Sequence, residues 1–372
     1  MSDTTAIAVS GGIDSLTAAF LLKEQGHKLI GIHFITGYEC SDSRHIEAVG
    51  DQIGIRIETI DCSRIFQSQV VDYFIQTYKA GQTPNPCLVC NPHIKFGAVL
   101  DAARKSGASR LATGHYARAE QDKTGRFRLL MGTDQKKDQS YFLAFLSQKQ
   151  LSSALFPLGN MTKSDVRTLA AENGLCPIAK KESQDVCFIR EGNYAEFLAR
   201  HGIAPTPGPI ENTDGKLLGT HNGLHLFTVG QRRGINCPAS EPYYVVRIDV
   251  VQNRLTVGFK KDLLCSECRV TGINWICQEP EKPISVFTRL RYRHKAVASE
   301  LFPIDRHTAA VRFEEPQSAV TPGQGAVFYD GDEVLGGGWI ENRDLSDHKF
   351  SRSKTFSTEV NFRAIVGCPS GT

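Results

Sequence analysis

The residues best suited to chemistry near the N-terminus form a short loop, Ser10-Gly11-Gly12-Ile13-Asp14-Ser15. Its two glycines let the backbone turn sharply and approach an anion closely. A helix is predicted to follow, and a helix N-terminus offers free N–H groups and a positive dipole end to phosphate. The serine hydroxyls add donors, and the Asp14 carboxylate suits Mg²⁺ bound to pyrophosphate. The loop is not a GxxxxGK[ST] sequence. A tight turn with a helix cap is the alternative, but a place after the first strand favours phosphate binding.

Two further segments carry cysteines whose thiols could react. Residues 81–91 read Gly-Gln-Thr-Pro-Asn-Pro-Cys-Leu-Val-Cys-Asn, and two prolines restrict this loop ahead of a helix predicted from Ile94. A thiol near a helix N-terminus, such as that of Cys90, is expected to have a lowered pKa. Cys187 follows Lys180 and Lys181, which also favour thiolate. Either cysteine alone is more typical of an ordinary buried thiol. Their presence beside a phosphate loop favours a reactive pair.

The elements that must position these residues alternate between strand and helix in the first third of the chain. Strands are predicted at 4–9, 28–35, 55–60 and 110–113, and helices at 16–25, 45–53, 66–78 and 94–105. This alternation predicts a doubly wound parallel sheet covered on both faces. Ligands bind such sheets beyond the carboxyl ends of the strands, where both Ser10–Ser15 and Thr113–His115 fall.

The second half of the chain has a different pattern of short strands separated by Gly and Pro turns. The predicted strands are 243–249, 254–258, 285–292, 309–313, 326–329 and 334–340. Their spacing predicts a small central β-rich module and a C-terminal β-barrel. We expect an α/β catalytic domain at 1–195, the central module at 196–265 and the barrel at 266–345. The tail at 346–372 is polar and carries no prediction.

Composition limits the class of protein. The chain has 372 residues, 41% of them hydrophobic, and a net charge of only +3, so contact with nucleic acid must come from local basic patches. It has no signal-peptide pattern and no apolar run of the roughly 20 residues that span a bilayer. We therefore expect a cytosolic (cytoplasmic) protein without membrane contact. There, the 11 cysteines are not expected to form a disulfide framework.

Eight segments in this order resemble those of the tRNA-specific 2-thiouridylases, a family of PP-loop ATP pyrophosphatases. They are 10–15, 83–91, 113–116, 137–143, 156–159, 183–188, 227–234 and 321–324. The match runs from about residue 6 to residue 343. The resemblance implies a PP-loop (HUP-type) first domain, cleavage of ATP to AMP and diphosphate, and thiolation of a uridine in tRNA, at wobble position 34.

Carried over to this sequence, the resemblance implies a role for each matching residue. Cys90 would be the catalytic nucleophile and Cys187 the catalytic persulfide carrier. ATP would be bound by Ala8, Val9, Ser10, Gly11, Gly12, Ile13, Asp14, Ser15, Phe34, Ile35 and Gly114. The target base would contact Asn85, Pro86 and Cys87, and other parts of the tRNA would contact His115, Lys137, Asp138, Gln139, Arg291, Tyr292 and Gln324.

These residue types fit the implied reaction. ATP adenylates the C2 oxygen of uridine, and sulfur then displaces AMP. A terminal persulfide on Cys187, loaded by an upstream sulfur-relay protein, attacks C2 directly. Alternatively, Cys90 reduces the persulfide and free hydrosulfide attacks. In both routes Cys90 and Cys187 end as a disulfide that a reductant must open.

One residue departs from the family pattern. Cys87 stands where the family usually has Asp, so that Cys87 and Cys90 form a CxxC sequence. Together with Cys187 they supply three thiolates, which could ligate a [4Fe–4S] cluster with one open iron. The alternatives are a resolving thiol in a redox CxxC and a neutral replacement of the aspartate.

Other clusters in the β-rich half are weaker signals. Arg289, Arg291, Arg293 and Lys295 alternate with other residues, so a strand would place all four cations on one face. A solvated face is the alternative to phosphate contact, which the family favours, as it does for Arg232 and Arg233. Phe328 and Tyr329 are predicted to be core residues. Cys265, Cys268 and Cys277 suggest zinc, but no fourth ligand is evident, so we interpret them as incidental thiols.

Two other functions compete with this interpretation. Another PP-loop enzyme could adenylate a small molecule, but it would not need two loop cysteines and a basic β-domain. A non-catalytic tRNA-binding protein could keep a relic ATP loop. The intact set of Ser10, Asp14, Ser15, Cys90 and Cys187 argues against it.

Overall fold

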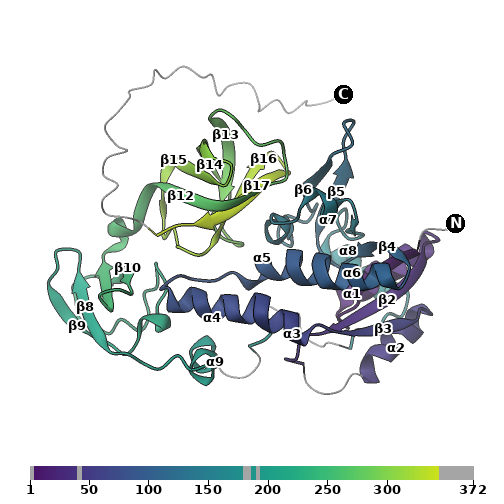
Figure 1. Cartoon of the computed structure of the whole chain (residues 1–372), viewed down its shortest axis with the longest axis horizontal. Helices are drawn as coiled ribbons and strands as arrows, with labels where there is room; N and C mark the ends of the chain where they lie inside the picture. Colours follow the sequence, from purple (N-terminus) through teal and green to yellow (C-terminus); the bar gives the residue numbers. More distant parts are fainter. Residues whose placement is uncertain (1–3, 40–43, 179–185, 190–192, 343–372) are drawn as a thin grey trace. The chain divides into compact units, whose positions relative to one another are not determined.

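A computed structural model describes residues 4–39, 44–178, 186–189 and 193–342 (Figure 1). Its first sheet has the strand order β3-β2-β1-β4-β7. The strands are β1 (Thr4–Ala8), β2 (Lys28–Ile35), β3 (Ile57–Asp61), β4 (Ala108–Ala112) and β7 (Ala154–Leu155), and every pairing is parallel. The predicted parallel sheet is therefore confirmed.

Helices cover both faces of this sheet. Successive residues of the central strand β1 point to opposite faces, so they pack into two different hydrophobic clusters. Ala6 and Ala8 belong to one hydrophobic cluster, while Ile7 and Val9 belong to another. The second cluster takes in α1 (Ile13–Glu24), α2 (Arg44–Ile53) and α8 (Lys163–Glu172). The first takes in α3 (Ser63–Phe66), α4 (Asp72–Lys79), α6 (Leu100–Lys105) and α9 (Tyr194–Arg200). The sheet is thus doubly wound, as predicted.

The cysteine segment is helical from an earlier residue than the sequence predicts. Helix α5 (Pro86–Cys90) begins at Pro86, whose fixed φ and missing N–H suit the first helical turn. It continues as a π-helical segment at 91–99, in which the Leu100 N–H donates to the Lys95 carbonyl. Pro92 lacks an N–H for the regular ladder, which accounts for the wider turns. Cys87 and Cys90 therefore lie inside a helix and not in a loop before it.

The C-terminal strands close into a barrel. These are β12 (Leu264–Trp275), β13 (Ile284–Arg289), β14 (Val297–Asp305), β15 (Thr308–Ser318), β16 (Gly325–Asp330) and β17 (Glu333–Ile340). The order β12-β15-β14-β13-β16-β17 is closed by pairing of β12 with β17. Phe328 and Tyr329 are 0% and 1% exposed, which confirms them as core residues. The predicted C-terminal barrel is confirmed.

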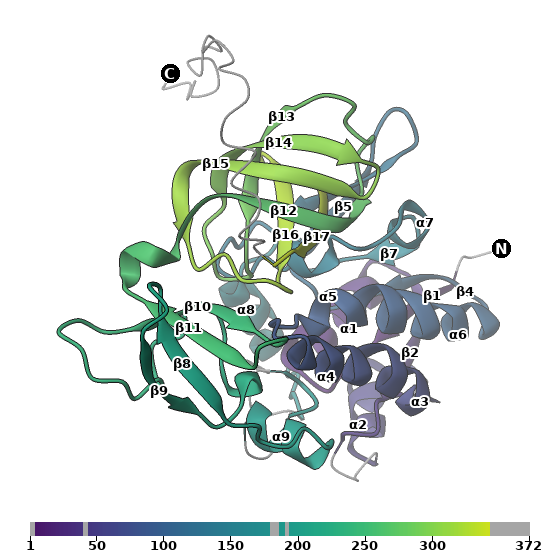
Figure 2. The ribbon, with the colours of Figure 1, turned by 60° about the vertical axis from the view of Figure 1, so that its left-hand side comes forward.

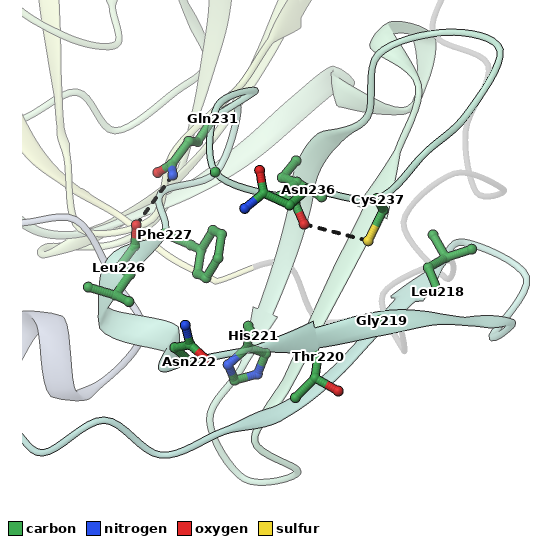
Figure 3. A pocket seen from close by; sticks show the side chains of 12 residues that line it. Leu218, Gly219, Thr220, His221, Asn222, Leu226, Phe227, Gln231, Asn236 and Cys237 are labelled. Carbon is green, nitrogen blue, oxygen red and sulfur yellow. Dashed lines mark hydrogen bonds between the residues drawn. The ribbon is translucent and has the colours of Figure 1, made fainter.

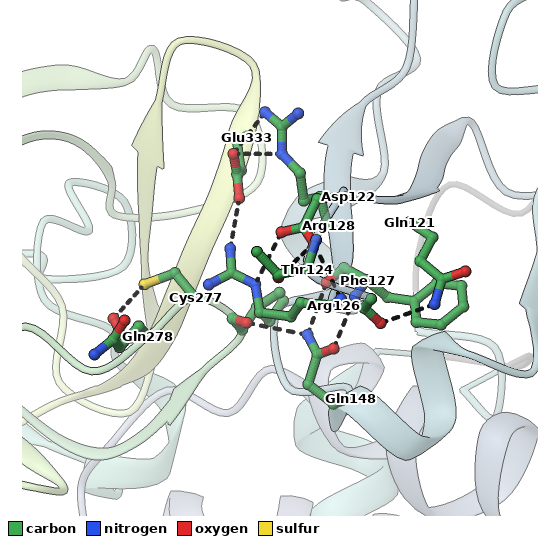
Figure 4. Close-up of polar contacts among 12 residues, drawn as sticks. Gln121, Asp122, Thr124, Arg126, Phe127, Arg128, Gln148, Cys277, Gln278 and Glu333 are labelled. Carbon is green, nitrogen blue, oxygen red and sulfur yellow. Dashed lines mark hydrogen bonds and ion pairs between the residues drawn. The ribbon is translucent and has the colours of Figure 1, made fainter.

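A hairpin from the first half of the chain extends this barrel sheet. Strands β5 (Ala117–Gln121) and β6 (Phe127–Met131) follow β17 in the sheet order, through pairing of β6 with β17. Glu333 accepts hydrogen bonds from Arg126 at 3.3 Å and Arg128 at 2.7 Å (Figure 4). Gln148, in helix α7 (Gln148–Leu151), donates hydrogen bonds from its side-chain amide to the carbonyls of Phe127 and Ile276. The α/β domain and the barrel thus share a sheet, which the sequence did not predict.

The central module is a small antiparallel and parallel sheet of order β10-β11-β8-β9 (Figure 2). Its strands are β8 (Gly208–Asn212), β9 (Leu217–His221), β10 (Tyr244–Asp249) and β11 (Arg254–Gly258). A separate core of Ile210, Phe227, Val245, Leu255 and Val257 holds them together. This confirms the predicted β-rich module. No helix among the described residues is long and apolar enough to cross a membrane.

The prediction of a continuous basic strand is wrong. Strand β13 ends at Arg289, and residues 290–294 form bends and a turn. Arg291, Arg293 and Lys295 are exposed there, whereas Arg289 is 9% exposed and pairs with Asp138. The period-two spacing persists in the sequence, but without a strand it places no row of four cations on one face.

Candidate active site

The predicted phosphate loop leads from the end of β1 into α1. Gly11 has a φ of +78°, a left-handed conformation that favours glycine. The Ser15 hydroxyl donates to the Gly12 carbonyl at 3.0 Å, and the Ser10 N–H donates to the Ser15 hydroxyl at 3.2 Å. Ser15 therefore closes the loop from inside, while Ser10 is exposed. The geometry presents the start of α1 at the carboxyl end of the sheet, as expected for a phosphate site.

Gly114 is placed against this loop by the end of β4. A Cβ at Gly114 would lie 2.9 Å from the Asp14 carbonyl carbon and 2.9 Å from the Ser15 nitrogen. Only a residue without a side chain lets the two backbones approach so closely. Phe34 and Ile35 are half-buried at the neighbouring end of β2. The structure thus gathers the residues predicted to bind ATP at one edge of the sheet.

Gly114→Ala is expected to weaken ATP binding. The added Cβ must push the start of α1 away, since its closest neighbours are backbone atoms, and overpacking of this kind costs about 1–3 kcal/mol. Calorimetric titration with ATP would measure the loss. Gly107→Ala is the matched control, because Gly107 has a φ of +87° and open space around it. It should lower stability and leave ATP affinity unchanged; wild-type affinity in Gly114→Ala would contradict the prediction.

Asp14, the predicted Mg²⁺ ligand, is paired in this structure. The Lys163 ammonium lies 2.7 Å and 2.8 Å from its two carboxylate oxygens, and the Tyr116 hydroxyl donates to Oδ1 at 2.7 Å. Sequence analysis missed both partners. Lys163 lies 149 residues away, and only the tertiary fold reveals the contact.

The three predicted sulfur-site cysteines lie within electrostatic reach of one another. Negative charge on Cys187 raises the pKa of both Cys87 and Cys90, while the Lys95 ammonium lowers both. Desolvation by the surrounding protein atoms is the largest cause, even for Cys87, whose side chain is partly in contact with solvent. It raises the pKa to about 11 for Cys87 and to about 12 for Cys90. The expected lowering of the Cys90 pKa is therefore wrong, because desolvation outweighs the cation.

This high pKa predicts slow alkylation of Cys90 in the free protein. A thiol reacts as thiolate, so a pKa of about 12 leaves little thiolate at pH 8. The rate with iodoacetamide should rise about tenfold per pH unit from pH 7 to 10. A free cysteine of pKa about 8.5 levels off in that range. Mass spectrometry of the labelled peptides would follow each site. A plateau for Cys90 near pH 8.5 would contradict the assigned pKa.

Lys95 is a second residue that sequence analysis missed. It lies in the π-helical segment after Cys90, and its ammonium contacts His115 Nε2 at 3.1 Å. Because a lysine only donates, Nδ1 of His115 carries the proton and donates to Thr113 Oγ1 at 2.7 Å. Burial, helped by Lys95, holds the pKa of His115 well below its usual value. His115 is 7% exposed and its ring holds Lys95, while its contact with tRNA stays a prediction.

Asp138 is also buried among protein groups. Its side chain is fully buried and accepts from the Arg289 guanidinium at 2.9 Å, as well as from the Ser140 hydroxyl and the Gly132 N–H at 3.1 Å each. A carboxylate with these partners holds the loop to the barrel, and its contact with tRNA stays a prediction. Gln139 and Lys137 are half-buried beside it, and the Gln139 side chain accepts from the Tyr116 N–H.

The loop before the cysteine helix is held by both β modules. Gln324 of the barrel donates to the carbonyls of Thr83 and Pro84 at 3.1 Å and 3.0 Å, and it accepts from Asn85 at 3.5 Å. The Thr83 hydroxyl donates to Thr228 of the central module at 3.3 Å. Asn85 is 8% exposed and Pro86 is buried. The structure therefore brings Gln324 and Asn85 together, and the contacts described for Gln324 are with this loop.

Two predicted tRNA contacts flank this junction. Tyr292 is half-buried and packs on Phe142, with ring centroids 4.3 Å apart. Arg291, next to it, is exposed and free to meet solvent or a phosphate. Among the residues predicted to contact tRNA, Arg291 thus keeps the surface position that the prediction requires.

Two cavities are lined by other residues. One of about 270 Å³ is in the central module, lined by Thr220, His221, Phe227, Gln231 and Asn236 among others (Figure 3). The other, of about 640 Å³, is lined by helices α4 and α5 and by Trp339 of the barrel. Neither is lined by the phosphate loop or by Cys87, Cys90 or Cys187.

The described residues contain no group of three or more His, Cys, Asp or Glu side chains arranged to hold a metal ion. The three thiols therefore do not fit a [4Fe–4S] cluster as they stand, and Cys265, Cys268 and Cys277 form no zinc site in this part of the chain. Mg²⁺ is different, because it commonly takes one carboxylate together with substrate phosphates. Asp14 fits that role, once it is released from Lys163.

Fold and site together define a PP-loop nucleotide-binding protein with two appended β modules. Residues 3–191 match the model of the tRNA methyl transferase HUP domain, residues 195–259 the tRNA methyl transferase PRC-barrel domain and residues 265–340 the aminomethyltransferase beta-barrel domain. The tRNA-specific 2-thiouridylase MnmA of Desulfosudis oleivorans is 55% identical over 337 residues, which are 90% of this chain and 94% of the relative. The MnmA of Geotalea uraniireducens is 44% identical over 353 residues, again 90% and 94%. The chain belongs to the tRNA-specific 2-thiouridylase family.

Proposed function

We propose that this protein is an ATP-dependent tRNA-uridine 2-sulfurtransferase, acting on wobble uridine 34. The observation that carries the proposal is the combination of a phosphate loop at the edge of the sheet with Cys87, Cys90 and Cys187 in electrostatic contact. A small-molecule adenylating enzyme would have no use for the sulfur cysteines. A non-catalytic RNA-binding protein would have no use for either group.

The chain's residues divide the reaction between them. The loop 10–15 binds the phosphates of ATP, with Asp14 holding Mg²⁺, and the C2 oxygen of uridine attacks the α-phosphorus. Sulfur from a Cys187 persulfide then attacks C2 and AMP leaves. Cys90 attacks the inner sulfur of Cys187, so that the two residues end as a disulfide. Burial of Cys90 keeps its thiol protonated until substrate and persulfide are in place.

The partner that loads Cys187 is proposed to be an upstream persulfide-carrying protein of the cytosol. Cys187 is exposed, as transfer from another protein requires. The two lysines predicted to favour its thiolate, Lys180 and Lys181, and the segment 183–185 lie outside the described residues.

A [4Fe–4S] cluster on Cys87, Cys90 and Cys187 stays a separate prediction, and no step above passes through it. Iron and acid-labile sulfide in anaerobically purified protein would decide it. About four of each per chain, lost together in Cys87→Ala, would establish the cluster. Absence of iron from the wild type would leave Cys87 as a resolving or neutral thiol.

The proposed function is tested by incubating the protein with ATP, Mg²⁺, a persulfide donor and unmodified tRNA. Nucleoside mass spectrometry should then find 2-thiouridine, with one AMP formed per thiolated tRNA. AMP formation from a small molecule without tRNA would favour the alternative enzyme. Tight tRNA binding without AMP formation would favour the non-catalytic protein.

A further inference from the structure

Lys163 reaches the phosphate loop from a distant part of the chain. Its side chain is 8% exposed, and its ammonium contacts both carboxylate oxygens of Asp14. Asp14 lies in the first turn of α1, two residues after Gly12 of the loop. A buried cation therefore sits where the phosphates of ATP are expected.

The position of this cation is fixed by its own helix. Lys163 is the first residue of α8, whose N-terminus is closed by a capping box between Thr162 and Asp165. The Lys163 N–H donates to Asp134 at 2.9 Å. Helix α8 packs on α1 within one hydrophobic cluster, through Val166 and Leu16 among others. The backbone of Lys163 is thus fixed by two helices, and its ammonium lies beside the phosphate loop.

The charges of the site must rearrange when ATP binds. In the free protein Lys163 and Asp14 neutralise each other, so the buried ammonium is paired with a carboxylate that is 32% exposed. Mg²⁺ bound to ATP needs the Asp14 oxygens that now accept from Lys163. Once Asp14 turns to the metal ion, the ammonium must find another anion, and the phosphates held by the loop are the anions at hand.

We propose that Lys163 is a catalytic residue of the adenylation step, binding the pyrophosphate part of ATP; this rests on the proposed function. The C2 oxygen of uridine bonds to the α-phosphorus, and the bond from that phosphorus to the bridging oxygen breaks. Its electron pair stays on the pyrophosphate, which leaves with one more negative charge, while the N3 proton of uridine passes to water. Lys163 stays protonated and donates hydrogen bonds to the oxygens on which this charge develops.

The competing explanation is that Lys163 only neutralises Asp14. The two explanations predict different results when Lys163 is substituted in the Asp14→Asn variant, where no carboxylate needs neutralising. If Lys163 serves Asp14 alone, Lys163→Gln adds no further loss there. If Lys163 binds pyrophosphate, the double variant loses more than Asp14→Asn. The double variant also pairs two amides, so it leaves no unpaired buried charge that would endanger folding.

The experiment measures ATP affinity by calorimetry with Mg²⁺ and no tRNA, and then pyrophosphate release with unmodified tRNA. Lys163→Gln should bind ATP about tenfold more weakly and release pyrophosphate about 100-fold more slowly. The double variant should fall at least about tenfold below Asp14→Asn in pyrophosphate release. Lys123→Gln, an exposed lysine in the β5–β6 turn, is the matched control and should behave as wild type.

Equal rates in the double variant and in Asp14→Asn would overturn the proposal, as would wild-type ATP affinity in Lys163→Gln. Circular dichroism and thermal midpoints without ligand establish that each variant is folded. A wild type that binds ATP but forms no 2-thiouridine would refute the proposed function instead. The effect of Lys163 on ATP affinity would still be readable in that case, because that titration contains no tRNA.

Discussion

Replacing Cys90 by serine is expected to abolish 2-thiouridine formation while leaving pyrophosphate release within about threefold of wild type. Serine keeps the size of the side chain but cannot accept sulfur or form the disulfide with Cys187. Loss of the sulfur-handling nucleophile should lower the thiolation rate by about 10³-fold or more. The phosphate loop is untouched, so adenylation continues and AMP appears by hydrolysis of the activated tRNA. Nucleoside mass spectrometry and a pyrophosphate assay on the same samples separate the two steps.

Cys176→Ser is the control for this substitution. Cys176 is a free thiol on the surface, where its Sγ contacts the Gly174 carbonyl. Its variant should thiolate tRNA at the wild-type rate. Equal loss of pyrophosphate release and thiolation in Cys90→Ser would assign Cys90 to adenylation and contradict its role in sulfur transfer.

Arg289→Met is expected to destabilise the protein by about 3–5 kcal/mol. The substitution leaves the Asp138 carboxylate without its cation, and that side chain is 0% exposed. The methionine side chain keeps the contact with the Tyr329 ring, over which the guanidinium lies at 5.0 Å. The lost charge therefore dominates the effect. Urea unfolding followed by tryptophan fluorescence would report it, because Trp339 and Trp275 both lie in the barrel sheet.

Two variants show whether the buried charge is the cause. Arg293→Met removes an exposed cation of the following turn and should change stability by less than about 0.5 kcal/mol. Asp138→Asn combined with Arg289→Met should recover part of the loss, because no charge is then buried alone. A double variant as unstable as the sum of its parts would show that the ion pair is not what Arg289 contributes.

The sequence carried enough information for the α/β fold because local patterns and tertiary packing agree there. Ala6, Ile7, Ala8 and Val9 are all apolar, as a strand buried on both faces requires, and the glycine loop follows at once. The barrel strands were likewise visible from their turns. The start of helix α5 was missed because the sequence was interpreted as a proline-rigid loop, whereas Pro86 begins a helix.

What the sequence could not show were partners brought together by the fold. Lys95 and Lys163 carry no local signal, since one meets His115 and the other meets Asp14 only after the sheet has formed. Arg289 has the same period-two spacing as the exposed cations that follow it. The spacing therefore could not show that Arg289 is buried. The predicted roles of the site residues stay predictions, but their neighbours now define sharper experiments.

The hydrogen bonds that hold residues 83–85 from Gln324 and Thr228 have a consequence for how the enzyme can be divided. The cysteine helix begins directly after this loop, so its orientation is set jointly by the barrel and the central module. A fragment ending at residue 195 would keep the nucleotide loop but lose the supports of its sulfur chemistry. The β modules therefore support the loop that precedes the cysteine helix. A substitution that displaces either module is therefore expected to displace the cysteine helix as well.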